Sequence, residues 1–177
     1  GIRIKSAEAD AMYAGIVIDT NNFTNQTGVR TFEAAAFLRR NGADVVRVRK
    51  LFRDDLDDYK AKAEAVREAE IFEGCFAIST CPSEGIESPT VVGAQAANEL
   101  LDIAGMKASI VMTFYNNTIY LSARSIDEVN VQVMMEKLGG GGHRTIAGAQ
   151  MQGVTVEEAK ERLKDVIRQM MEEGEVS

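Results

Sequence analysis

The sequence is poor in the residue types on which several common sites and frameworks depend. Its 177 residues include one histidine, two cysteines, two prolines and no tryptophan. The single histidine argues against a metal site built from several histidines within the chain. Cys75 and Cys81 stand six positions apart without a second pair, which fits neither a zinc motif nor a disulfide framework. We expect two free thiols in a reducing compartment.

Long apolar runs and an excess of positive charge are also absent. No run approaches the about 20 apolar residues that span a bilayer, and the N-terminus lacks a signal-peptide pattern, so we expect a soluble chain. The 20 Lys and Arg face 27 Asp and Glu, a formal charge of −7, which disfavours a broad surface for long nucleic acid. A small anion remains a suitable ligand where a few cations converge.

The residues that are present have the composition of an ordered globular protein, with 45% hydrophobic and 27% charged side chains. The length suits one ordinary domain, or two small ones that share a cleft. The chain enters an apolar run almost at once and has no starting methionine, from which we expect a piece of a longer protein.

The order of apolar and polar patterns predicts an α/β fold. Strands are expected at residues 13–18, 71–80, 108–114, 118–124 and 146–151. Helices are expected at residues 32–40, 54–70, 88–105 and 125–138, and from a capping box at Thr155 and Glu158 toward the C-terminus. We interpret the charged helix at 54–70 as a connection between two lobes, residues 1–53 and 71–177.

A run of glycines followed by the single histidine is the first candidate site. Gly140, Gly141 and Gly142 let successive backbone N–H groups converge on an anion, and the ring of His143 adds a directional donor. The alternative is a flexible helix C-cap beside an incidental histidine.

The strand at 118–125 is the second candidate site. Alternation places Tyr120, Ser122 and Arg124 on one face of it. A serine and an arginine two positions apart can hold one phosphate, with the guanidinium in a bidentate fork. The alternative is an arginine that is merely exposed on a half-buried strand. Ser125 and Glu128 have the spacing of a capping box, so Ser125 is expected to cap the next helix.

Asp19 is the third candidate, because it ends the apolar run at 13–18. Folds of the α/β class place ligand-binding and metal-binding groups at the carboxyl ends of strands. An Asx turn or a helix cap is an equal alternative, and one carboxylate cannot hold a catalytic metal alone. Arg30, at the mouth of the next helix, either binds an anion or forms a surface ion pair, and the latter is favoured.

These motifs together resemble the DHH phosphoesterases with their DHH-associated C-terminal domain, over nearly the whole chain. GIVIDTNNF with TGVRTFEAAAFLRRNGA is similar to the last motif of the DHH domain. SARS and GGGGHRTIAGAQ are similar to the two signatures of the associated domain. Longer stretches, such as SARSIDEVNVQVMMEKLGGGGH, resemble the membrane-anchored cyclic di-AMP phosphodiesterases of the GdpP/YybT type.

The resemblance implies a fold, a reaction and a role for each candidate residue. Residues 1–53 would be the end of a DHH catalytic lobe, and residues 71–177 a mixed-sheet α/β substrate-binding lobe. Two manganese ions would open cyclic di-AMP to linear pApA. Asp19 would be a metal ligand, and Arg124, Ser122 and Gly140 to His143 would hold the nucleotide; Arg30 is a weaker transfer.

The same resemblance implies that important parts lie outside this chain. The Asp-x-Asp and Asp-His-His metal motifs of the family are missing, so no catalytic residue is assigned here and the chain is expected to be inactive alone. A membrane-anchored parent is a further expectation from the resemblance, whereas a homodimer is expected because exposed apolar surface favours association. Two alternatives remain: a RecJ-like exonuclease for short oligonucleotides or single strands, and a non-catalytic nucleotide-binding module.

Overall fold

The computed structural model describes residues 4–176, and the chain divides into two compact units, Gly1–Asp54 and Asp55–Ser177. The predicted α/β class is confirmed, because helices and a six-stranded mixed sheet make up the described residues. No helix among them is long and apolar enough to cross a membrane.

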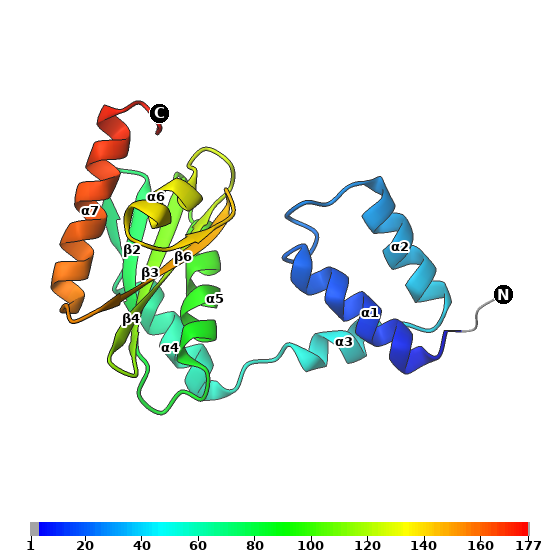
Figure 1. Cartoon of the computed structure of the whole chain (residues 1–177). Helices are drawn as coiled ribbons and strands as arrows, with labels where there is room; N and C mark the ends of the chain where they lie inside the picture. Colours follow the sequence, from blue (N-terminus) through cyan, green and yellow to red (C-terminus); the bar gives the residue numbers. More distant parts are fainter. Residues whose placement is uncertain (1–3, 177) are drawn as a thin grey trace. The chain divides into compact units, whose positions relative to one another are not determined.

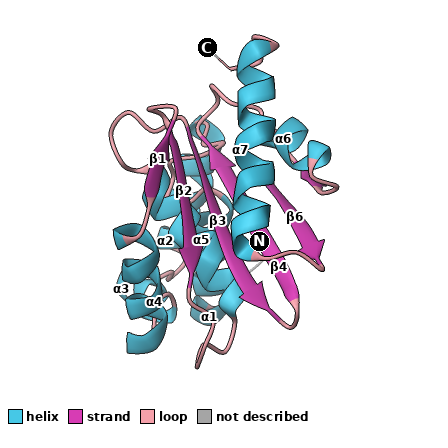
Figure 2. Ribbon diagram, turned by 90° about the vertical axis from the view of Figure 1, so that its left-hand side faces the viewer, coloured by secondary structure: helices cyan, strands magenta, loops and turns pink. Residues whose placement is uncertain are grey.

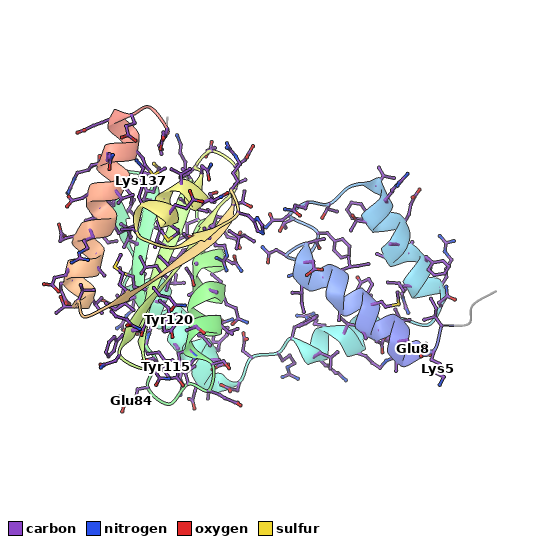
Figure 3. The ribbon with its side chains drawn as sticks, in the orientation of Figure 1. Lys5, Glu8, Glu84, Tyr115, Tyr120 and Lys137 are labelled. Atoms are coloured by element: carbon purple, nitrogen blue, oxygen red, sulfur yellow. The ribbon has the colours of Figure 1, made fainter. Side chains whose placement is uncertain are left out.

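The first unit consists of three helices, α1 (Ser6–Asp19), α2 (Val29–Arg40) and α3 (Val45–Leu51) (Figure 1). The strand predicted at residues 13–18 is wrong, because this segment is the second half of α1. Four alanines favour the helix, and the Glu8 carboxylate accepts the backbone N–H of Lys5 at 2.9 Å at its start (Figure 3). A helix begun in this way continues through the β-branched run that suggested a strand.

The core of the first unit is small, with Ala9, Leu38 and Ala43 at its buried centre. A polar contact supports it. The carboxylate of Asp10 accepts the Nε–H of Arg47 at 2.7 Å and the backbone N–H of Asp44 at 2.6 Å. The hydrogen bond from Arg47 holds the pKa of Asp10 below its usual value. Asp10 therefore links α1 to the segment that begins α3.

The second unit is built on one sheet with the strand order β1-β2-β3-β4-β6-β5 (Figure 2). Only β2 and β3 are parallel, and the other neighbours are antiparallel. The strands are β1 (Glu70–Phe72), β2 (Phe76–Cys81), β3 (Ala108–Tyr115), β4 (Thr118–Ser125), β5 (Gly141–Gly142) and β6 (Ile146–Gln152). The single strand predicted at 71–80 is thus two strands, joined by a turn in which Glu73 and Gly74 have positive φ.

Helices cover both faces of this sheet. They are α4 (Leu56–Arg67), α5 (Pro89–Leu101), α6 (Val131–Lys137) and α7 (Val156–Glu172). Helices α6 and α7 pack on one face, against side chains such as Ile110 and Leu121 (Figure 2). Helices α4 and α5 pack on the other face, against Ala77 and Val111. Strands β2 and β3 are therefore buried on both faces, as near-continuous apolar runs are expected to be.

The charged helix predicted at 54–70 corresponds to α4. Its buried residues Ala61 and Ala65 pack in the same core as α5 and β2, and Lys62 forms an ion pair with Glu99 of α5 at 3.3 Å. Helix α4 is therefore part of the second unit, and its alanines form the face that packs in the core of that unit.

The two predicted capping boxes had different outcomes. The box at Thr155 is confirmed, because its backbone N–H donates to Glu158 at 2.7 Å and its side chain accepts in return. The box at Ser125 is wrong. Ser125 ends β4, and its hydroxyl donates to the carbonyl oxygen of Val129 at 2.7 Å. Asn130 caps α6 instead.

Candidate functional site

A pocket of about 380 Å³ lies on the face of the second unit's sheet that carries α5. It is lined by residues from α5, β4, β6 and residues 139–142, the glycine segment. The lining residues are Thr90, Tyr120, Leu121, Ser122, Gly139, Gly140, Gly148, Ala149 and Gln150. The predicted residues Ser122 and Gly140 thus lie in one pocket, although 18 positions separate them in the sequence. Tyr120, at the β4 wall, is labelled in Figure 3.

Strand β4 supplies one wall of the pocket, and its alternation is as predicted. Ile119, Leu121 and Ala123 are buried in the core beneath α6 and α7, whereas the residues between them are only half-buried. The half-buried set is Tyr120, Ser122 and Arg124. Because alternate residues of a strand are roughly 7 Å apart, Arg124 lies just beyond the pocket on the same face as Ser122.

The strand register brings the glycine segment beside these β4 residues. Ser122 pairs with Gly148, and Gly148 pairs in turn with Gly141. This row carries only one side chain, so bare backbone forms the sheet surface there. A row of this kind lets a ligand approach the main chain closely.

A second row lies two positions further along β4. Arg124 pairs with Ile146, and His143 exchanges backbone hydrogen bonds with Ile146 at 2.7 and 3.3 Å. His143 therefore stands at the start of the tight turn between β5 and β6, with an exposed side chain. With strands spaced about 4.8 Å apart, the two rows gather Ser122, Arg124, Gly141 and His143 on a small area of sheet.

The turn that carries His143 is hydrogen-bonded to the end of β4, to the start of α6 and to the loop between them. Val131 donates its N–H to the carbonyl oxygen of Arg144 at 2.9 Å, and Ser125 donates to that of Thr145 at 3.0 Å. The guanidinium of Arg144 bonds the side chain of Asp127 at 2.9 Å. Part of the predicted alternative is present, because Gly139 has φ +80° and Gly140 donates its N–H to the carbonyl oxygen of Met135 at 2.8 Å, which makes a glycine C-cap at the end of α6.

The glycines of this segment differ in what their positions require. A Cβ on Gly140 would lie 2.6 Å from the Cα of Ala149, and one on Gly142 would lie 2.5 Å from the Cα of Ala147. Gly142 also has φ +147°. A Cβ on Gly141 would meet no atom within 4 Å. Close packing against β6 therefore demands glycine at 140 and 142, whereas nothing in the packing demands it at 141.

Arg124 carries a charge that no carboxylate neutralises among residues 4–176. Its Nε–H donates to the side-chain oxygen of Asn98 at 3.0 Å, and Nη1 donates to the carbonyl oxygen of Ala123 at 2.9 Å. Burial lowers the pKa of its guanidinium, which nevertheless stays far above neutral pH. A cation that is partly desolvated and has only neutral partners is suited to bind an anion.

Two predicted site residues belong to the first unit. Asp19 is the exposed last residue of α1, so the expected setting at the carboxyl end of a strand is wrong. Arg30 is exposed in the first turn of α2, as its predicted place at the mouth of that helix requires. Neither residue lines the pocket of about 360 Å³ within this unit. Across the part of the chain that the structure describes, no group of three or more His, Cys, Asp or Glu could hold a metal ion.

The DHHA1 domain family matches residues 74–173, which include both strands and the whole glycine segment of this site. This chain belongs to the DHHA1 family. Over 174 residues, 98% of its length, it is 43% identical to the cyclic-di-AMP phosphodiesterase GdpP of Geobacillus thermodenitrificans. Over 166 residues it is 43% identical to the cyclic-di-AMP phosphodiesterase PdeA of Listeria monocytogenes. The chain spans only 26% and 25% of the length of these two relatives.

A solved structure shows the same fold. It is an exopolyphosphatase-related protein from Bacteroides fragilis, with a TM-score of 0.84 and 19% sequence identity, covering 94% of this chain and 51% of that one. At this identity the likeness is evidence for the fold alone.

Of the nine residues that line this pocket, only Ser122 and Gly140 are among the predicted site residues. Thr90 lies in the first turn of α5, next to Pro89, and Gln150 lies opposite Tyr120 on β6. The sequence predicted a helix from residue 88, but no sequence pattern places the start of that helix beside β4. Gln150 is the last residue of the GGGGHRTIAGAQ stretch, and strand alternation within that stretch was the available signal for it.

Proposed function

We propose that this chain is the nucleotide-binding C-terminal part of a phosphodiesterase that hydrolyses cyclic di-AMP to linear pApA. The observation that carries the proposal is the unneutralised guanidinium of Arg124 beside a pocket floored by glycine backbone. The names of the two relatives supply the substrate class. Since the chain spans about a quarter of their length, the activity would belong to the longer protein.

The proposed roles follow from the geometry of the two rows. Arg124 would hold a phosphate through the N–H groups that Asn98 and Ala123 leave free, and the Ser122 hydroxyl would add a donor from the same face. The glycine row would let sugar or phosphate approach the backbone, and the exposed ring of His143 would contact phosphate or base. The pocket between Thr90 and Gln150 would take the rest of the nucleotide.

The expected manganese ions do not fit the residues described here. Asp19 is one exposed carboxylate without a nearby acidic or histidine partner set, and a two-metal site requires several ligands. Within the proposal, Asp19 would be one ligand of a centre completed by residues outside this chain, and the isolated chain would bind nucleotide without cleaving it.

Two further parts of the proposal, a role for Arg30 and a membrane-anchored parent protein, rest on the family resemblance. Arg30, exposed and cationic, would contribute to substrate binding. The parent protein would be anchored in the cell membrane, with this part in the cytoplasm. A homodimer is the proposed assembly, and long nucleic acid is not a proposed ligand, because the net charge is −7.

Titration calorimetry tests the binding role. We expect pApA and cyclic di-AMP to bind the 177-residue chain without added metal, and Arg124→Ala to weaken binding by about 10- to 100-fold, because charged hydrogen bonds are lost. Arg162→Ala is the matched control, since Arg162 is an exposed arginine on α7, the helix on the opposite face of the sheet. Equal effects of the two substitutions would contradict the proposed site.

The absence of a metal cluster from residues 4–176 favours one second candidate, a non-catalytic nucleotide-binding module. The two functions differ in an assay on a chain extended toward the N-terminus. Manganese-dependent conversion of cyclic di-AMP to pApA supports the phosphodiesterase, and nucleotide binding without hydrolysis supports the module. Preferential cleavage of linear oligonucleotides would indicate an exonuclease instead.

A further inference from the structure

Asn98 holds Arg124 from the neighbouring helix with a side chain that carries no charge. Its Oδ1 accepts the Nε–H of Arg124 at 3.0 Å, and the second acceptor, the carbonyl oxygen of Ala123, is neutral as well. A guanidinium has five N–H groups. Within the described part of the chain, these two bonds leave the others without a protein acceptor.

The position of Asn98 is rigidly set by the packing of α5. One turn before it, Gly93 approaches β3 so closely that a Cβ would collide with Thr113 Oγ1. The carbonyl oxygen of Ala97, the residue preceding Asn98, accepts the buried hydroxyl of Ser109. Both contacts set the distance between α5 and the sheet, and with it the distance from which the Asn98 side chain contacts β4.

The same side of α5 serves the pocket. Thr90 and Asn98 are eight positions apart, so helical spacing puts them near one side of the helix. Thr90 lines the pocket, and Asn98 contacts the next half-buried β4 residue after Ser122. The helix thus borders the pocket and the arginine together.

We infer that Asn98 is a positioning residue, which orients the Arg124 guanidinium toward a phosphate without neutralising it; the inference rests on the proposed function. An aspartate at this place would offer the same acceptor atom. It would also form an ion pair with Arg124 and compete with the phosphate for the same charge. A neutral amide gives the orientation and leaves the charge for the ligand.

A purely structural role for Asn98, tying α5 to β4, makes the opposite prediction for one substitution. Asn98→Asp keeps the link between helix and strand and adds an attraction, so the folded state should stay at least as stable. If Asn98 only stabilises the fold, this variant should bind pApA normally. If Asn98 preserves the charge of Arg124, it should be stable and bind poorly.

Titration of pApA into the 177-residue chain, paired with thermal unfolding, separates these cases. We expect Asn98→Asp to bind at least about tenfold more weakly with an unchanged or higher Tm, and Asn98→Ala to bind several-fold more weakly. Asn116→Asp is the control for charge, because it adds the same charge in the β3–β4 turn, beyond the far end of β4. It should bind like the unaltered chain.

A second readout does not depend on the ligand. The Nε–H signal of Arg124 in a ¹H–¹⁵N NMR spectrum should be protected from solvent exchange, and Asn98→Ala should remove the protection. Unaltered protection in that variant would overturn the inference. So would normal pApA binding by Asn98→Asp in a chain whose Arg124→Ala variant has lost it. Failure of the unaltered chain to bind pApA would instead contradict the proposed function, and the inference with it.

Discussion

Gly140 and Gly141 are neighbours in the sequence, but a methyl group added to them meets different surroundings. At position 140 the new Cβ would lie 2.6 Å from both the Cα and the Cβ of Ala149, and it would collide with the carbonyl oxygen of Gly148. These atoms belong to the backbone of β6 or sit directly on it, so they cannot move aside cheaply. At position 141 the same methyl group meets nothing within 4 Å.

The expected magnitudes follow from this difference. Overpacking of a well-packed region costs about 1–3 kcal/mol, so Gly140→Ala should lower the free energy of unfolding by about 2 kcal/mol and the Tm by several degrees. Gly141→Ala introduces no clash and reduces the conformational freedom of the unfolded chain. It should therefore change the free energy of unfolding by less than about 1 kcal/mol.

Guanidinium unfolding of the two variants, followed by circular dichroism, measures the difference. Because Gly140 lines the pocket and Gly141 does not, pApA binding should also weaken more in Gly140→Ala. Equal stabilities of the two alanine variants would refute the reasoning that close approach to β6, and not backbone freedom alone, requires glycine at 140.

Two further predictions concern side chains outside the site. Glu70 accepts a hydrogen bond from Lys164 at 2.7 Å, which lowers the pKa of Glu70. This ion pair therefore stabilises the folded state above the unfolded-state pKa of Glu70, and the stabilisation is lost as pH falls through the folded-state pKa. Because the Glu70 side chain is 42% exposed and solvent screens the ion pair, Glu70→Gln should cost no more than about 0.5 kcal/mol at pH 7 and less at acidic pH; a difference in urea midpoints that did not change with pH would contradict this. Burial raises the pKa of Cys81 to about 11, so iodoacetamide at pH 8 should modify the half-buried Cys75 first, as peptide mass spectrometry would show; faster labelling of Cys81 would count against the packing described.

The sequence allowed good predictions where a local pattern and the packing agree. The alternation of Tyr120, Ser122 and Arg124 was predictable because one face of β4 is buried and the other is not. The helix from Thr155 was predictable because a reciprocal cap and an apolar stripe coincide. The strand predicted at residues 13–18 was wrong because β-branched residues favour a strand only where they can pack in a sheet. Here the preceding alanines favour a helix, which continues through this segment.

The parts of the site that were missed depend on long-range placement. That Asn98 holds Arg124, or that Thr90 lines the pocket, follows from how α5 lies along β4. No spacing within α5 contains that information. Likewise, Ser122 faces Gly148 because of a strand register that the separate SARS and GGGGHRTIAGAQ motifs do not specify.

The register of β6 also limits where the chain can tolerate insertions. One residue added between Gly148 and Arg144 would turn the rest of β6 over, moving its core side chains to the pocket face and uncoupling Ile146 from Arg124. A residue added in the Asn116–Asn117 turn, or at Gly153, lies beyond the paired rows and would leave them in place. Length variation among related chains should therefore gather at those turns and avoid the stretch from His143 to Gly148.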